Sequence, residues 1–152
     1  MFEKLCGDDT PMVRRAAAAH LGPLARQLMH APAVEGEGTG GSSSGISIVT
    51  GRLLPLASRL AKDQQDSVRL LAVDVCASLA PLVGPEAAAG QLLPMAVQLC
   101  NDSSWRVRWS VANGFASLCS ALGADAAKGE LLHAFGKLAA DAEAEVRTAA
   151  AS

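Results

Sequence analysis

A seven-residue motif occurs four times in this chain and constrains its fold more than any other feature. Each copy begins with Asp and ends with Val-Arg, and an apolar pattern of helical period follows it. The copies read DDTPMVR at 8–14, DQQDSVR at 63–69, DSSWRVR at 102–108 and DAEAEVR at 141–147. The last three copies are 39 residues apart. A fixed period of this length is typical of repeat architectures.

A second segment repeats in step with the motif and lies just before it. It reads LLPLASRLAKD, LLPMAVQLCND and LLHAFGKLAAD ahead of the last three copies, and MFEKLCGDD aligns with its end ahead of the first. Ala and Leu dominate both segments and aromatic residues make up only 3% of the chain, which favours helices over strands. Each unit is therefore predicted to be a helix pair. Such pairs must stack to bury their apolar faces, so we predict an all-α solenoid of HEAT repeats.

The period also predicts the organisation of the chain. The first two copies are 16 residues further apart than the others, and the Gly/Ser-rich stretch EGEGTGGSSSG accounts for the excess. Since the outer copies each lack most of one helix, we expect a slice of a longer array that is marginally stable and self-associating. The predicted segments are a partial first repeat (1–30), a flexible insert (31–47), a second repeat (48–84), a third repeat (85–123) and a partial fourth repeat (124–152).

Helix boundaries are marked locally. Thr10, followed by Pro11, and Ser104 are predicted N-caps, while Gly84 and Gly123 are predicted helix stops. Pro23 interrupts a predicted second helix, and we expect a kink near it.

The Asp and Arg of each motif are six residues apart in every copy. If the copies stack in register, each Asp comes near an Arg of an adjacent copy and the pairs form a ladder along the array. A ligand-binding role for the arginines is the alternative, but recurrence in all copies favours the structural role. The predicted ladder residues are Asp8, Arg14, Asp63, Arg69, Asp102, Arg108, Asp141 and Arg147.

Composition argues against several classes of function. A net charge of −2 argues against a nucleic-acid binder that works by bulk charge. No apolar run is long enough to cross a membrane, and the first residues lack the pattern of a secretion signal. The four cysteines and three histidines are scattered without metal-ligand spacing, so free buried thiols in a reducing compartment, with no metal and no cofactor, are expected.

Residues that vary between the turns are candidates for binding, because residues that hold the repeat together are alike in all copies. Trp105 beside Arg106 has the composition of an interface hot spot, although local packing of the Trp against a neighbouring turn is the alternative. Met12, next to Pro11, is equally consistent with partner binding and with covering a helix end. Arg15 is equally consistent with a partner contact and with a solvated charge.

In combination, LCGDDTPMVRRAAA, DQQDSVRLLAV, SWRVRW and AEAEVRTAAAS resemble the middle HEAT repeats of the scaffold (A) subunit of protein phosphatase type 2A. The resemblance extends over the chain apart from about residues 31–47. It implies a non-catalytic scaffold, cytoplasmic or also nuclear, that holds a regulatory subunit on this segment and the catalytic subunit on repeats outside it. The regulatory-subunit contacts that it implies are Asp9, Pro11, Met12, Arg15, Asp66, Ser104, Trp105 and Arg106.

Two alternatives remain open. One is a generic HEAT-repeat adaptor or transport solenoid that uses its concave face. The other is a HEAT-like enzyme, such as a helical-repeat DNA glycosylase or a pigment lyase, for which a clustered active site and more aromatic residues would be expected. Few aromatic residues and a slightly negative charge favour a protein-binding scaffold with no nucleic-acid, membrane or small-molecule partner.

Overall fold

The computed structural model describes residues 1–30 and 41–152, and every regular element in these two ranges is a helix. The elements are α1 (Phe2–Leu5), α2 (Pro11–His30), α3 (Gly41–Ile48), the π-helix η1 (Val49–Leu53), α4 (Leu54–Leu60), α5 (Asp66–Arg69), α6 (Leu71–Val83), α7 (Pro85–Ala87), the π-helix η2 (Ala88–Leu92), α8 (Leu93–Cys100), α9 (Trp105–Leu122), α10 (Ala124–Lys128), α11 (Glu130–Ala139) and α12 (Ala144–Ala150).

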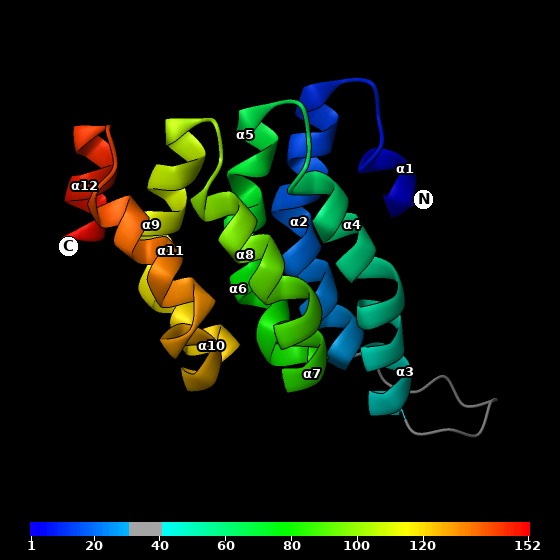
Figure 1. Cartoon of the computed structure of the whole chain (residues 1–152). Helices are drawn as coiled ribbons and strands as arrows, with labels where there is room; N and C mark the ends of the chain where they lie inside the picture. Colours follow the sequence, from blue (N-terminus) through cyan, green and yellow to red (C-terminus); the bar gives the residue numbers. More distant parts are fainter. Residues whose placement is uncertain (31–40) are drawn as a thin grey trace.

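The helices stack as antiparallel pairs in two rows (Figure 1). The first helices of the copies form one row, namely α1, α3–η1–α4, α7–η2–α8 and α10–α11. The second helices form the other row, namely α2, α5–α6, α9 and α12. The turns that join the two helices of each copy lie along one edge, at the top of Figure 1. This arrangement confirms the predicted all-α solenoid.

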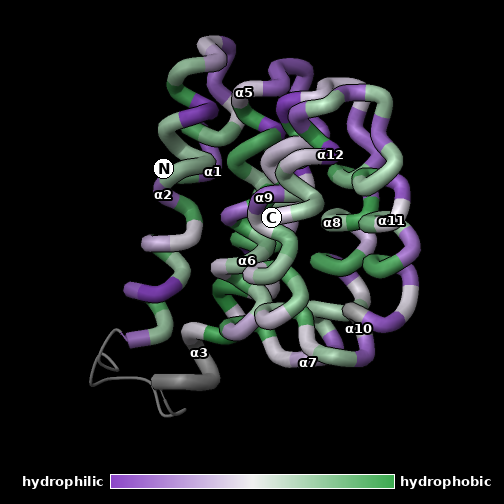
Figure 2. The backbone as a smooth tube through the Cα atoms, turned by 90° about the vertical axis from the view of Figure 1, so that its left-hand side faces the viewer, coloured by the Kyte–Doolittle hydropathy of each residue, from purple (hydrophilic) through white to green (hydrophobic). Residues whose placement is uncertain are grey.

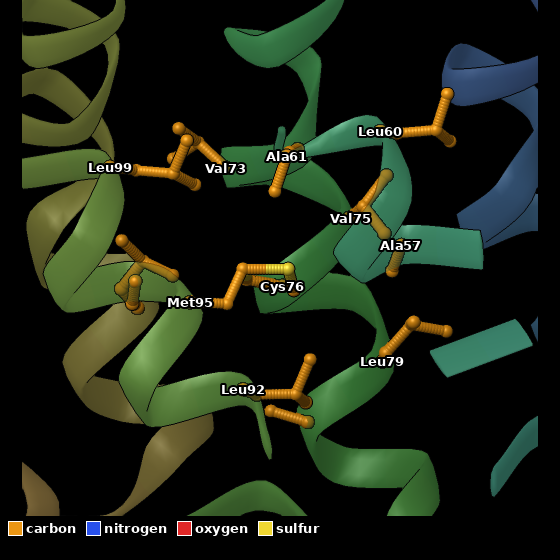
Figure 3. Close-up of a cluster of buried hydrophobic side chains, with 14 of the residues drawn as sticks. Ala57, Leu60, Ala61, Val73, Val75, Cys76, Leu79, Leu92, Met95 and Leu99 are labelled. Carbon is orange, nitrogen blue, oxygen red and sulfur yellow. The ribbon is translucent and has the colours of Figure 1, made fainter. Parts of the chain in front are cut away.

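The core runs through the array between the two rows. Figure 3 shows its central part, where side chains of α4, α6, η2 and α8 meet. Leu60, Leu79, Leu92 and Leu99 are at most 1% exposed there. Full burial of a Leu side chain contributes roughly 1.5–3 kcal/mol, so stacking of the copies supplies most of the driving force for the fold. Figure 2 shows hydrophobic residues along the helices and a concentration of hydrophilic residues at the turns.

The first helix of the second and of the third copy contains a π-helical turn that the sequence analysis did not anticipate. In both, the turn ends at a Leu-Leu-Pro step, where the proline nitrogen has no hydrogen to donate and its ring would clash with the carbonyl four residues earlier. The backbone N–H groups of Leu54 and Leu93 instead bond to carbonyls five residues earlier. The fourth copy has His133 in place of the proline, its N–H bonds to Gly129 four residues earlier, and α11 has no π-turn.

The predicted flexible insert is partly wrong. Residues 31–40 lie outside the described residues, but residues 41–48 form α3, which packs on α2. A glycine at the point of contact permits this packing. Gly45 is buried, and a Cβ placed on it would lie 2.9 Å from the carbonyl oxygen of Leu28. Tertiary packing thus overrides the low helix propensity of a Gly/Ser sequence.

The predicted helix stops are confirmed. Gly84 and Gly123 end α6 and α9 with φ angles of +81° and +92°, a backbone region that favours glycine. Ser104 is the N-cap residue of α9, as predicted, but its side chain makes no capping hydrogen bond and its hydroxyl donates to Asp66 instead. The helix α2 continues through Pro23 to His30.

Candidate protein-binding ridge

The four turns that join the helices of each copy form the edge that we call the turn ridge, at residues 6–10, 61–65, 101–104 and 140–143. Each turn is fixed in the same way by the Asp of the motif. One carboxylate oxygen of this Asp accepts a hydrogen bond, 2.8–2.9 Å long, from the backbone N–H two residues later. Asp side chains commonly stabilise turns in this manner. The donor and acceptor pairs are Thr10–Asp8, Gln65–Asp63, Ser104–Asp102 and Glu143–Asp141.

The Arg of each motif joins its own turn to the next one. Arg69 donates from Nη1 to the backbone oxygens of Asp63 and Gln64 in its own turn, at 2.8 and 3.1 Å. It donates from Nε and Nη2 to the two carboxylate oxygens of Asp102 in the next turn, both at 2.8 Å. A planar guanidinium suits this bidentate geometry, which a Lys cannot reproduce.

The same bonds recur in the neighbouring copies. Arg14 is bidentate to Asp63, with distances of 2.6 and 2.9 Å. Arg108 is bidentate to Asp141, with distances of 2.6 and 3.0 Å. The structure therefore brings six of the eight predicted ladder residues together as three ion pairs between adjacent copies, which we call rungs. The other two, Asp8 and Arg147, lie at opposite ends of the array and are not joined to each other or to another copy within the described residues.

The rungs shift the pKa values of their carboxyl groups. The hydrogen bond from Arg14 is the largest influence on Asp63 and lowers its pKa, and Arg108 does the same for Asp141. Burial pushes the pKa of Asp102 upward, but the hydrogen bonds from Arg69 and from the Ser104 N–H outweigh it, so that this pKa is also lowered. All three carboxyl groups are therefore held in the charged form that the rungs need.

The candidate residues of the third turn form one cluster with Asp66 of the second copy. The hydroxyl of Ser104 donates to Asp66 Oδ2 at 2.8 Å, and Arg106 Nη1 lies 3.9 Å from the same oxygen. The Arg106 guanidinium also stacks on the ring of Trp105, 5.0 Å from its centre. We call Asp66, Ser104, Trp105 and Arg106 the Trp105 cluster.

Trp105 is less exposed than the sequence analysis expected. It is half-buried and packs against the apolar core at the start of α9. Its ring contacts the core and lies under the Arg106 guanidinium, while its partner-binding role stays a prediction. A half-buried aromatic ring with fixed neighbours loses little conformational freedom on binding, which suits an interface anchor.

The candidates of the first turn lie at the end of the ridge, and no contact in the described residues joins them to the Trp105 cluster. Asp9 and Arg15 are exposed, and Pro11 is half-buried as the first residue of α2. Met12 is 79% exposed. Met12 also lines an apolar pocket of about 310 Å³ with Phe2, Leu5, Val13, Ala16, Ala17 and His20.

Sequence reasoning did not select Trp109, which is the more exposed tryptophan at 41%. This residue lines a groove of about 410 Å³ between α9 and α12, together with Asn113, Glu145 and Thr148. The sequence did contain a sign of it: the residue at this repeat position differs in every copy, being Arg15, Leu70 and Thr148 in the other three.

The thiols are held in the protonated form. Burial raises the pKa of Cys76 and of Cys100 to about 12, and raises the pKa of Cys119 to a smaller extent. All four cysteines are free. Within residues 1–30 and 41–152, no three His, Cys, Asp or Glu residues lie close enough together to hold a metal ion. No helix in the described part is both long and apolar enough to cross a bilayer.

Comparison with protein families agrees with the repeat geometry. The model of the HEAT repeat matches residues 1–28 and 92–122, which include the first and third turns. Two segments of the chain thus match the HEAT repeat. The second and fourth motif copies have the same turn geometry as those in the matched segments, and rungs join them to their neighbours, so the structure extends the pattern along the array.

Two relatives carry phosphatase names. The chain is 40% identical over 83 residues to a "Probable serine/threonine-protein phosphatase PP2A regulatory subunit" of Caenorhabditis elegans. It is 34% identical over 82 residues to a protein phosphatase PP2A regulatory subunit of Schizosaccharomyces pombe. These matches cover 55% and 54% of this chain, and 11% of each relative. The chain thus spans about a tenth of the length of the relatives that it matches.

A solved structure shows the same fold over almost the whole chain. It is the complex of CpcE and CpcF of phycocyanin lyase from Nostoc sp. PCC7120, with a TM-score of 0.56. The match covers 99% of this chain and 94% of that one, at 20% sequence identity. At this identity the likeness concerns the helical-repeat fold alone.

Proposed function

We propose that this chain is a non-catalytic scaffold segment of a type 2A protein phosphatase, and that its turn ridge binds a regulatory subunit. The Trp105 cluster is the observation that carries the proposal. It places an aromatic ring, a guanidinium and a carboxylate side by side on an edge that the rungs hold rigid. The similarity to phosphatase regulatory subunits supports this assignment.

The proposed mechanism is geometric. Three rungs fix the spacing of the four turns, so the variable residues of neighbouring turns present a preorganised surface to a partner. A scaffold that holds two subunits together raises the effective concentration of one at the other and orients both. In this proposal the segment contributes the regulatory-subunit surface, and the catalytic subunit binds to repeats outside it.

Trp105→Ala tests the assignment. Removal of the ring should weaken binding of a type 2A regulatory subunit by about 2 kcal/mol, roughly 30-fold in Kd, as is common for an anchoring Trp. The matched control is Trp109→Ala, which removes the other tryptophan from α9 and should leave this Kd unchanged. Isothermal titration calorimetry supplies the Kd, and circular dichroism checks that both variants stay helical.

The same pair of variants separates the second candidate, a generic adaptor solenoid. The observation that favours an adaptor is the groove between α9 and α12, where Trp109 is exposed beside Asn113 and Glu145. An adaptor that uses this groove predicts the opposite result, with binding lost in Trp109→Ala and retained in Trp105→Ala. Equal binding by both variants and the unaltered chain would reject the ridge as the binding surface.

A further inference from the structure

The groove between α9 and α12, which we call the Trp109 groove, presents hydrogen-bond acceptors to a ligand. Trp109 supplies an aromatic ring that is 41% exposed, and Glu145 supplies a carboxylate. The hydroxyl of Thr148 donates to the backbone oxygen of Ala144 at 2.9 Å, so toward a ligand it is left to accept. The amide oxygen of Asn113 is a further acceptor. A group that donates hydrogen bonds and carries positive charge fits this lining, which contains neither Lys nor Arg within the described residues.

The interface of the second and third copies shows how such groups hold a cation. Arg106 lies over the ring of Trp105, 5.0 Å from its centre, and 3.9 Å from a carboxylate oxygen of Asp66. The guanidinium thus interacts with an aromatic ring and with a carboxylate that belong to adjacent copies. The Trp109 groove offers the same two groups, again from adjacent copies, because Trp109 belongs to the third copy and Glu145 to the fourth. It therefore has the chemistry of a site for a cationic side chain.

The pairing of an aromatic ring with a carboxylate at these two repeat positions is confined to one interface in the described part of the chain. Between the first two copies the equivalent positions hold Arg15 and Ser67, and between the second and third they hold Leu70 and Arg106. Each of those pairs contains an arginine, which repels a cation. A cationic ligand is therefore directed to the groove between the third and fourth copies.

A guanidinium matches the groove better than an ammonium does. It is planar, has several N–H donors and no acceptor, stacks on aromatic rings and forms bidentate hydrogen bonds with a carboxylate. The groove has a volume of about 410 Å³, near the lower end of the roughly 300–1,000 Å³ that is common for small-ligand sites. This size suits one long side chain.

We propose that the Trp109 groove binds an arginine side chain from a basic segment of a partner protein, with the guanidinium stacked on Trp109 and bonded to Glu145. Charge complementarity between the acceptor lining and a guanidinium selects this occupant. The partner is a further protein and not the regulatory subunit, whose Kd Trp109→Ala should leave unchanged. The inference does not rest on the proposed function, because an arginine site on the second-helix row is compatible with any HEAT-repeat scaffold.

Nuclear magnetic resonance of the whole chain tests this proposal, with an acetylated Gly-Ser-Arg-Ser-Gly peptide as the probe. The chain has two tryptophans, and Trp109→Leu assigns their indole N–H signals by removing one of them. Addition of the peptide should shift the Trp109 signal in a saturable manner and leave the Trp105 signal in place. The same peptide with citrulline in place of arginine keeps the shape but loses the charge, and it should shift neither signal.

Two variants of matched charge test the role of the carboxylate. Glu145→Gln should weaken peptide binding about tenfold, because it replaces a charge-assisted bidentate contact by a neutral one. Glu143→Gln removes an exposed negative charge two residues earlier, outside the groove lining, and should leave the Kd of the peptide unchanged. Trp109→Leu should weaken binding about fivefold through loss of the aromatic ring, followed by the side-chain amide signal of Asn113.

Three results would overturn the proposal: a Trp109 signal that does not move, a citrulline peptide that shifts it as much as the arginine peptide does, or equal weakening in Glu145→Gln and Glu143→Gln. Circular dichroism checks the helicity of each variant. If a variant loses helicity, the comparison of the two peptides on the unaltered chain still decides. Loss of the arginine site would leave the regulatory-subunit test with Trp105→Ala unaffected, so the two proposals can fail separately.

Discussion

The arginine of each motif explains at the residue scale why the motif recurs. A single guanidinium satisfies carbonyls of its own turn and both carboxylate oxygens of the next, so the same side chain shapes a turn and sets the spacing of two copies. The recurrence of Asp and Arg six residues apart allowed the pairing between adjacent copies to be predicted, but not the bonds from the Arg to the carbonyls of its own turn. The stacking of Arg106 on Trp105 could not be predicted, because it depends on how far the Trp ring enters the core.

Arg69→Ala should destabilise the chain by about 2 kcal/mol. The substitution removes charge-assisted hydrogen bonds and leaves Asp102, whose side chain is only 8% exposed, without its cation. Urea unfolding followed by circular dichroism measures the change. The control is Arg52→Ala, which truncates an exposed arginine and should cost under about 0.5 kcal/mol. A stability loss in Arg69→Ala no larger than that of the control would contradict a structural ladder.

Stability should fall in acid because of the same rungs. The pKa values of Asp63, Asp102 and Asp141 are lowered in the folded chain, so near pH 4 the unfolded chain binds more protons than the folded one. The stabilisation is complete above the unfolded pKa of about 4 and is lost as the pH falls through the folded values. Urea midpoints at several pH values should show this loss, with a shallower slope in Arg69→Ala. If the urea midpoint falls with pH equally steeply in the unaltered chain and in Arg69→Ala, the rungs are not the cause of the pH dependence of stability.

Proline position shapes the helices at the element scale. The Leu-Leu-Pro steps coincide with π-turns in two copies, and His133 coincides with regular helix in a third. The missing proline N–H was visible in the sequence, but the response of the backbone was not, since a kink or a break would satisfy the same constraint. The α3 helix was missed for a different reason: its stability comes from contact with α2, which no local pattern in a Gly/Ser segment records.

Gly84→Ala should destabilise the chain by about 1 kcal/mol, because the φ angle of +81° is unfavourable for any residue with a Cβ. The space around the new Cβ is empty, so the effect is conformational rather than steric. Gly136→Ala is the matched control: this glycine lies inside α11, also with open space, and the change should stabilise by up to about 1 kcal/mol. Thermal unfolding of both variants should give shifts of opposite sign. Shifts of the same sign would contradict the assigned backbone conformations.

Position along the array matters at the scale of the whole molecule, because each copy contacts only its neighbours. Leu99 and Leu138 occupy the same repeat position, and both are at most 1% exposed. Leu99 lies in the third copy, with neighbours on both sides. Leu138 lies in the fourth, at one end of the described array. The same Leu→Ala substitution at these two positions should therefore destabilise different lengths of the array.

Leu99→Ala and Leu138→Ala should each cost about 2–5 kcal/mol locally. Hydrogen exchange should show protection lost throughout the array in Leu99→Ala, because the defect separates the copies on its two sides. In Leu138→Ala the loss should concentrate in α11 and α12, while α2 and α6 stay protected. Uniform loss in both variants would indicate that the chain unfolds as one indivisible unit.

The polar contacts that join different copies within the described residues all lie close to the turn ridge. They are the three rungs, the contacts of Ser104 and Arg106 with Asp66, and the bonds of Gln98 to Ala61, Lys137 to Asn101 and Ser110 to Leu70. The opposite edge, near α7 and α10, is held by directionless apolar contact (Figure 1). Directional bonds therefore resist sliding of the copies at the turn ridge, and apolar contacts at the opposite edge resist it less. A bending force should thus separate the helices at the α7–α10 edge, with the turn ridge acting as the hinge.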